Sequence, residues 1–448
     1  MLNWIWLALV VLAVAIGGWN NRLGEVTSGA FDGAKTAVTI ALGLIGIMAL
    51  WLGVMRLAER AGLVQRIARV LRPFMRRLFP DVPPEHPAMG SMLMNMAANM
   101  LGLGNAATPL GLRAMRDLEQ LNPRPTVASN AMCTFLAINT ASVQLIPATA
   151  IALLASAGST RPTAIVGTAL LATLCAATVA ITSAKLLEKL PFFRLPSVVA
   201  GFDDPGRTAA MSPSAAMNDP GYSDNVTAVE PRGWRRILPF LLVLFFVALF
   251  VRLVFPTWFN LPTDPNAANQ NTFVRCVNII SILAIPFLLS FFPVYAATRR
   301  IKVYEEFVEG AKEGFGVILK IIPFLVTMLV GIGMFKGAGG IDLLTRLLTP
   351  VLTPLQFPPD LLPLALMRPL SGSATLALLT DIIHRLGPDN IVSLMAATIY
   401  GSTETTFYVA AVYFGSVNIK QTRHAIPAGL LGDLAGVIAS VIICRAVF

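Results

Sequence analysis

Long apolar segments separated by short polar or basic stretches make up most of this chain. Several approach the roughly 20 apolar residues that a helix needs to cross a bilayer, among them residues 237–255 and 317–335. The first 18 residues form another apolar run with no Lys or Arg before it, which favours a retained first helix over a cleaved signal peptide. The pattern predicts an all-α polytopic membrane protein with about nine transmembrane spans.

Composition agrees with this class. Of the 448 residues, 55% are hydrophobic and only 13% are charged, against about 25% in soluble domains. The net charge of +10 lies largely beside apolar spans, as in the run of arginines from Arg56 to Arg77, which indicates cytoplasmic loops rather than a nucleic-acid partner. Cysteine spacing and the absence of a Walker A, nucleophile-elbow or HExxH motif predict no metal, no cofactor and no enzyme activity.

A segment rich in Pro, Gly, Ser, Ala and Asp, residues 196–233, predicts a flexible cytoplasmic linker between two membrane domains, 1–195 and 234–448. The two halves show the same order of features. FDGAK at 31–35 matches VEGAK at 308–312, and LNP at 121–123 matches LGP at 386–388. We therefore expect two degenerate repeats, with one extra span at about 235–255 between them.

Basic residues predict the orientation of each repeat. The arginine run follows the first repeat's span at about 36–56, whereas Arg299, Arg300 and Lys302 precede the matching span at about 317–335. Placing all of these residues in the cytoplasm makes the repeats inverted, a common plan of secondary transporters. It also places the N-terminus and the linker on the cytoplasmic side. The membrane is expected to be the cytoplasmic (inner) membrane of a bacterium.

Two matching segments, at about 88–121 and 360–387, are polar where a continuous membrane helix should be most apolar. The first is broken at Gly102 and Gly104, and the second at Arg368-Pro369 before Ser371. Such backbone is tolerated at membrane depth only inside protein or beside a cavity. We expect re-entrant or discontinuous helices whose N-termini point to the centre of the molecule. The alternative is that these small residues only allow close helix packing.

Polar residues of the following spans converge on the same level, with a kink expected at Pro147. An intramembrane carboxylate is costly, so Glu404 should be paired, protonated or hydrated, with Arg368 as its partner and Asp381 as a further member of the charge pair. A purely structural Arg368–Glu404 pair is the alternative. The candidate substrate-binding residues are Asn95, Asn99, Asn105, Thr108, Asn139, Thr140, Ser142, Gln144, Arg368, Ser371, Ser373, Ser402, Thr403, Glu404 and Thr405.

The stretches GSMLMNMAANMLGLGNAATPLGLRAM and GSTETTFYVAAVYFGSV resemble the spore maturation A and B families, respectively, which are identified with the nucleoside recognition, or Gate, family. The resemblance covers essentially the whole chain and implies a natural fusion of the two. The resemblance also extends to domains of concentrative nucleoside transporters and of a ferrous iron transporter, and it implies a transport-type core.

Together these features predict a secondary transporter or permease-like protein with a polar midplane site and Glu404 as its coupling group. The substrate would be a small polar solute, nucleoside-like or anionic. A lipid-translocating protein and a structural or regulatory scaffold in envelope or spore maturation are the alternatives. The expected partners are the bilayer and the small-molecule or lipid substrate, and a homo-oligomer is left open.

Overall fold

The computed structural model describes residues 2–102, 104–193, 237–255, 272–340, 343, 346 and 357–448, and the linker lies outside this part of the chain. All named elements of the described residues are helices, which confirms the all-α prediction. In the first half they are α1 (Leu2–Trp19), α2 (Leu23–Arg60), α3 (Leu63–Leu78), α4 (Pro87–Met100), α5 (Gly104–Gln120), α6 (Asn130–Ala141), α7 (Ala148–Ser156) and α8 (Ile165–Leu187). In the second they are α10 (Ile237–Val254), α12 (Thr272–Thr298), α13 (Val303–Gly337), the 3-10 turn η4 (Pro359–Leu361), α15 (Leu362–Met367), α16 (Gly372–Leu386), α17 (Ile391–Ser402), α18 (Thr406–Ser416) and α19 (Ala425–Val447).

Five helices in the described part of the chain, α2, α8, α10, α12 and α19, are long and apolar enough to cross a membrane. This confirms a polytopic membrane protein. Two segments expected to be continuous spans are interrupted instead, one between α6 and α7 and the other between α17 and α18. The expected kink at Pro147 is therefore a complete break.

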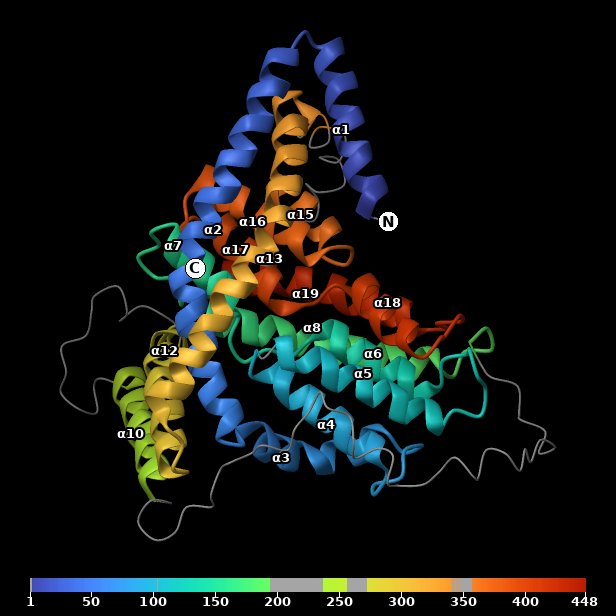
Figure 1. Cartoon of the computed structure of the whole chain (residues 1–448), viewed down its shortest axis with the longest axis vertical. Coiled ribbons are helices and arrows are strands. Elements are labelled where there is room, and N and C mark those ends of the chain that lie inside the picture. Colours follow the sequence, from blue (N-terminus) through green and yellow to red (C-terminus); the bar gives the residue numbers. More distant parts are fainter. Residues whose placement is uncertain are drawn as a thin grey trace.

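The longest helices, α2 and α13, run antiparallel along each other and form, with α1, the tall arm of the molecule (Figure 1). Their 38 and 35 residues correspond to about 57 and 52 Å of helix. Glycines allow their backbones to touch: a Cβ atom on Gly29 would lie 2.3 Å from the carbonyl oxygen of Gly333, and one on Gly33 would meet that of Leu329. Small residues at such spacing are typical of helix pairs in membranes.

A second antiparallel pair, α8 and α19, lies across the lower part of the arm (Figure 1). Gly432 lies against Ala180 and Gly436 against Ala176, so the sequence positions run in opposite directions along the two helices. In the predicted repeats, α2 corresponds to α13 and α8 to α19. Both pairs pack antiparallel, and the inverted-repeat relation between them stays a prediction.

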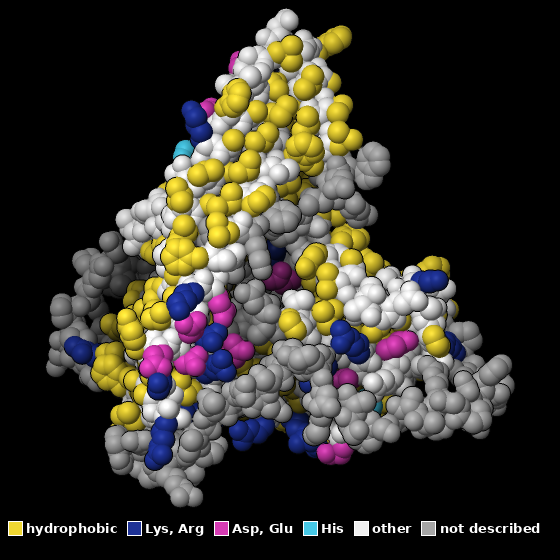
Figure 2. Space-filling view, in the orientation of Figure 1, with side chains coloured by type: hydrophobic (Ala, Val, Ile, Leu, Met, Phe, Trp, Pro, Cys, Tyr) yellow, Lys and Arg dark blue, Asp and Glu magenta, His cyan; other side chains and the backbone are white. Residues whose placement is uncertain are grey.

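The surface divides into apolar and charged regions. Figure 2 shows hydrophobic side chains over the arm, where Val11, Phe31 and Leu42 are exposed, as expected for a surface that faces lipid. Charged side chains gather lower down, near the ends of α2 and α13, where Arg56 donates to Glu306 at 2.9 Å. The two halves are thus joined by ion pairs at the end of the helix pair that the arginine run predicts to be cytoplasmic.

A loop contact joins the halves elsewhere. Asp389, between α16 and α17, accepts hydrogen bonds from the Ser159 hydroxyl at 2.6 Å and from both the amide and the hydroxyl of Thr160, at 3.0 and 2.7 Å. These bonds lower the pKa of Asp389 below its ordinary value of 3.8, the Ser159 bond most of all. They favour the carboxylate, so the contact contributes stability when Asp389 is ionised.

We therefore expect Asp389→Asn to lower stability modestly at neutral pH. A carboxyl group with a depressed pKa contributes stability above its unfolded-state pKa and loses it as the pH falls through the lower folded-state pKa. The difference between variant and wild type should be constant from pH 6 to 8 and shrink below about pH 4. Thermal unfolding in detergent across this range measures it, and a difference that grows on acidification would contradict the assignment.

Candidate functional site

Helix breaks from the two halves of the chain lie in contact with each other. In the first half α4 ends at Met100 before α5 begins at Gly104, with Gly102 at a φ of +73°, and α6 and α7 are separated by residues 142–147. In the second half residues 368–371 separate α15 from α16, and Thr403, Glu404 and Thr405 separate α17 from α18. Each half therefore contributes two breaks, and three of the four contain or directly adjoin predicted site residues.

Backbone groups freed by these breaks are satisfied by other segments. The Glu404 amide donates to the Thr140 carbonyl at 2.7 Å, and the Thr173 hydroxyl donates to the carbonyls of Ala141 and Ser142 at 3.0 Å each. Within each half, one break is tied to the other, because Leu145 donates to the Met100 carbonyl and Phe407 to the Pro369 carbonyl, both at 3.0 Å. Irregular backbone at membrane depth requires such partners.

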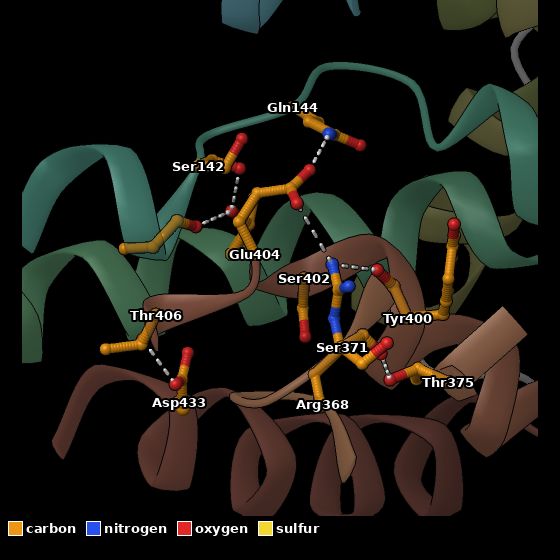
Figure 3. A network of polar contacts seen from close by, with 12 residues as sticks. Ser142, Gln144, Arg368, Ser371, Thr375, Tyr400, Ser402, Glu404, Thr406 and Asp433 are labelled. Atoms are coloured by element: carbon orange, nitrogen blue, oxygen red, sulfur yellow. Dashed lines mark hydrogen bonds and ion pairs between the residues drawn. The ribbon is translucent and has the colours of Figure 1, made fainter. Parts of the chain in front are cut away.

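Arg368 and Glu404 form the charged part of this polar centre (Figure 3). A guanidinium nitrogen of Arg368 lies 3.8 Å from a carboxylate oxygen of Glu404 and donates to the Tyr400 carbonyl at 2.9 Å. The guanidinium also stacks over the Tyr400 ring, 4.8 Å from its centroid. Gln144, from the first half, donates to the other Glu404 oxygen at 3.2 Å. The Arg368 side chain is 3% exposed and that of Glu404 37%, so the carboxylate is the accessible member.

An amide cluster lies on the first half's side. Asn99 donates to the Asn139 side-chain oxygen at 2.9 Å, and the Tyr413 hydroxyl approaches the same oxygen at 3.4 Å. Asn95 bridges the Ala107 carbonyl, at 2.7 Å, and the Tyr413 hydroxyl, at 3.3 Å. Residues from α4, α6 and α18 thus hold one another in fixed orientations, and Asn95 and Asn139 are almost wholly buried.

A hydroxyl cluster faces α19. The Thr406 hydroxyl donates to the Asp433 carboxylate at 2.6 Å, and the hydroxyls of Ser402 and Ser440 lie 3.3 Å apart. Thr403 and Thr405 flank Glu404 and are buried. These contacts anchor the α17–α18 break to the last helix. The anchoring matters because α18 itself is only 11 residues long.

The remaining predicted residues have varied positions. Ser371 is the N-cap of α16 and accepts from the Ala374 amide, with the Ser373 hydroxyl 3.2 Å away. The hydroxyl of Thr140 donates to the Ala137 carbonyl, and Ser142 is the α6 C-cap with a φ of +31°. Thr108 lies in α5, as does Asn105, whose side chain is outside the described residues.

Asp381 does not join the central pair. It lies in α16, 3.5 Å from Lys336 and 3.6 Å from Arg385, and forms ion pairs with both. The expectation that it shares a charge pair with Glu404 and Arg368 is corrected by these partners. The sequence could not show this, because Lys336 belongs to a distant helix that meets α16 only in the folded chain.

Two residues of the centre were not among the predicted site residues. Tyr413 resembles an ordinary aromatic residue of an apolar span, and no sequence signal distinguishes its hydrogen-bonding role. Asp433 did carry a signal, since an acid within the apolar last helix is costly and usually functional. Its position opposite Thr406 became evident only from the packing of α18 on α19.

Comparison with known proteins places the chain in a family. The Gate model, described as nucleoside recognition, matches residues 41–157 and 318–420, once in each half. Spore maturation protein A of Bacillus subtilis (strain 168) is 48% identical over 174 residues, which are 39% of this chain and 89% of that protein. Spore maturation protein B of the same organism is 43% identical over 175 residues, 39% of this chain and 98% of that protein.

No solved structure matches the chain. The two curated relatives are each covered almost completely, and the Gate matches include all the helix breaks described above. The chain belongs to the family of spore maturation proteins A and B and carries a match to the nucleoside recognition (Gate) model in each half.

Proposed function

We propose that this membrane protein is a secondary transporter or permease that binds a small polar solute at the centre where its interrupted helices meet. The observation that carries the proposal is the position of Glu404. It lies in a helix break, is bonded to Arg368 of its own half and Gln144 of the other, and is 37% exposed beside an almost fully buried cation. An accessible carboxylate beside a buried cation can exchange its partner for a solute, an ion or a proton.

The chemistry of the centre suits a polar cargo. Amide groups, hydroxyls, a carboxylate and a guanidinium can together donate and accept hydrogen bonds, as a nucleoside-like solute or a small anion would require. The description of the matching family model, nucleoside recognition, supports the first of these classes. Inverted repeats with broken helices around a central site are a recurrent transporter plan.

Transport into proteoliposomes tests this. Purified protein should take up at least one labelled nucleoside or small anion faster than empty vesicles do, and an ion gradient should drive accumulation. Glu404→Gln should reduce gradient-driven uptake about tenfold or more, because it removes the charge at the accessible position.

Glu305→Gln is the matched control, since Glu305 is an exposed residue paired with Lys302 and should leave uptake unchanged. If Glu404→Gln and wild type take up every transported solute alike, the result contradicts the proposed role of Glu404. If no solute moves but a dithionite assay shows faster exposure of fluorescent lipid headgroups than in empty vesicles, the protein is a lipid translocator instead.

A further inference from the structure

Asp433 is an acid that the proposed solute site does not use. It lies in the middle of α19, is 3% exposed, and is surrounded by helices rather than by solvent. One carboxylate oxygen accepts from the Thr406 hydroxyl at 2.6 Å. The other has no hydrogen-bond partner among the described residues. A fully buried carboxylate with a single neutral donor is far from satisfied as an anion.

Small, neutral side chains lie beside Asp433 among the described residues. Beside it on α19, Gly432 packs against Ala180 of α8, and Gly429 against Thr140 of α6 and Thr406 of α18. Among the described residues, the charged groups that act on Asp433 are Arg368, from the α15–α16 break, and Glu404, from the α17–α18 break. Both belong to the polar centre described above.

Charge balance in this centre is incomplete if every group is ionised. Two carboxylates, Glu404 and Asp433, then share one guanidinium, that of Arg368. Arg368 is in contact with Glu404 and is further bonded to the Tyr400 carbonyl and stacked on its ring, so its position is fixed on the Glu404 side. One negative charge would then have no counter-charge. It would be that of Asp433, the more buried carboxylate with the poorer hydrogen-bond partners.

We propose that Asp433 is a proton-binding site, protonated in the state seen here, and that its proton is the coupling ion of the polar centre. Protonation at the unpartnered oxygen converts the Asp433 carboxylate into a neutral carboxyl group. The centre then has one carboxylate for one guanidinium. Loss of the proton would place a second anion beside the Thr406 end of α18 and make it compete with Glu404 for Arg368. The coupling role rests on the proposed transport function, whereas the protonation of Asp433 is independent of it.

Infrared difference spectroscopy of the reconstituted protein tests the proton directly. At neutral pH wild type should show the carbonyl stretch of a protonated carboxylic acid, and raising the pH should remove it. Asp433→Asn should abolish this band at neutral pH. The neutral amide keeps the shape of the side chain and can still accept from Thr406, so the fold should tolerate it.

Two matched controls locate the proton. Asp381→Asn changes another helix-borne acid that is already paired with Lys336 and Arg385, and it should retain the band with an unchanged titration. Glu404→Gln removes the carboxylate that competes for Arg368, so the band should disappear at a lower pH than in wild type. A band that is absent from wild type at neutral pH, or that persists in Asp433→Asn, overturns the proposal.

A second variant keeps the test decisive should Asp433→Asn fail to fold. Thr406→Val keeps the β-branched shape but removes the one hydroxyl that donates to Asp433, so the carboxylate loses its stabilising bond and the band should persist to higher pH. An unchanged titration in this variant would contradict the site. Because neither measurement needs a solute, a failed transport assay alongside a confirmed band would refute the coupling role and leave the proton site standing.

Discussion

Replacing Arg368 by methionine should destabilise the protein by about 3 kcal/mol or more. The change removes the ion pair with Glu404, leaves the buried Tyr400 carbonyl without its donor, and ends the stacking on the Tyr400 ring. Part of the cost is relieved because the abandoned Glu404 is partly exposed and can take up water or a proton. Equilibrium unfolding of the micelle-bound protein by increasing SDS measures the loss.

Two further variants make this result specific. The double variant Arg368→Met/Glu404→Gln should recover part of the loss, because it removes the carboxylate that the single change leaves without a cation. Arg385→Met is the matched control: Arg385 pairs with Asp360 and Asp381 while 30% exposed, and its loss should cost about 1 kcal/mol or less. Equal losses of stability in Arg368→Met and Arg385→Met would show that the central pair contributes no more than a partly exposed ion pair.

Gly333→Ala should destabilise the packing of α13 on α2 by about 1–3 kcal/mol. A Cβ atom at this position would overlap the Gly29 carbonyl oxygen, and backbone cannot rotate away as a side chain can. The helices must move apart or shift along each other, which loses contacts over much of their shared length. The same unfolding measurement should show the loss.

Gly316→Ala provides the opposite expectation on the same helix. A Cβ atom on Gly316 meets nothing within 4 Å, and alanine is a better helix former than glycine by about 1 kcal/mol. We expect it to be neutral or slightly stabilising. Two alanine substitutions in one helix would then have opposite signs. If Gly333→Ala also stabilises, α2 and α13 do not approach as closely as described.

Much of the fold and part of the site could be predicted from the sequence. The breaks near Gly102 and at Arg368-Pro369 follow from residues that cannot continue an apolar helix, and the structure places helix ends there. Arg368 and Glu404 could be associated because each charge is costly alone in an apolar setting. The full extent of the breaks around Ser142 and Glu404 could not be predicted from the sequence. The hydrogen bonds that replace the helical ones come from Thr173, Thr140 and Pro369, which lie in other segments of the chain.

The sequence by itself determined the class of the protein, its helical content and the polar character of its centre, since hydrophobic length, helix breakers and the cost of buried charge are local properties. Only the tertiary structure decided which charges share a partner. Asp381 is paired with Lys336 and Arg385, while Asp433 faces Thr406 in the same centre as Arg368 and Glu404. The energy of a buried carboxylate depends on the groups within a few ångströms of it, and those neighbours come from helices whose packing no single stretch of sequence encodes.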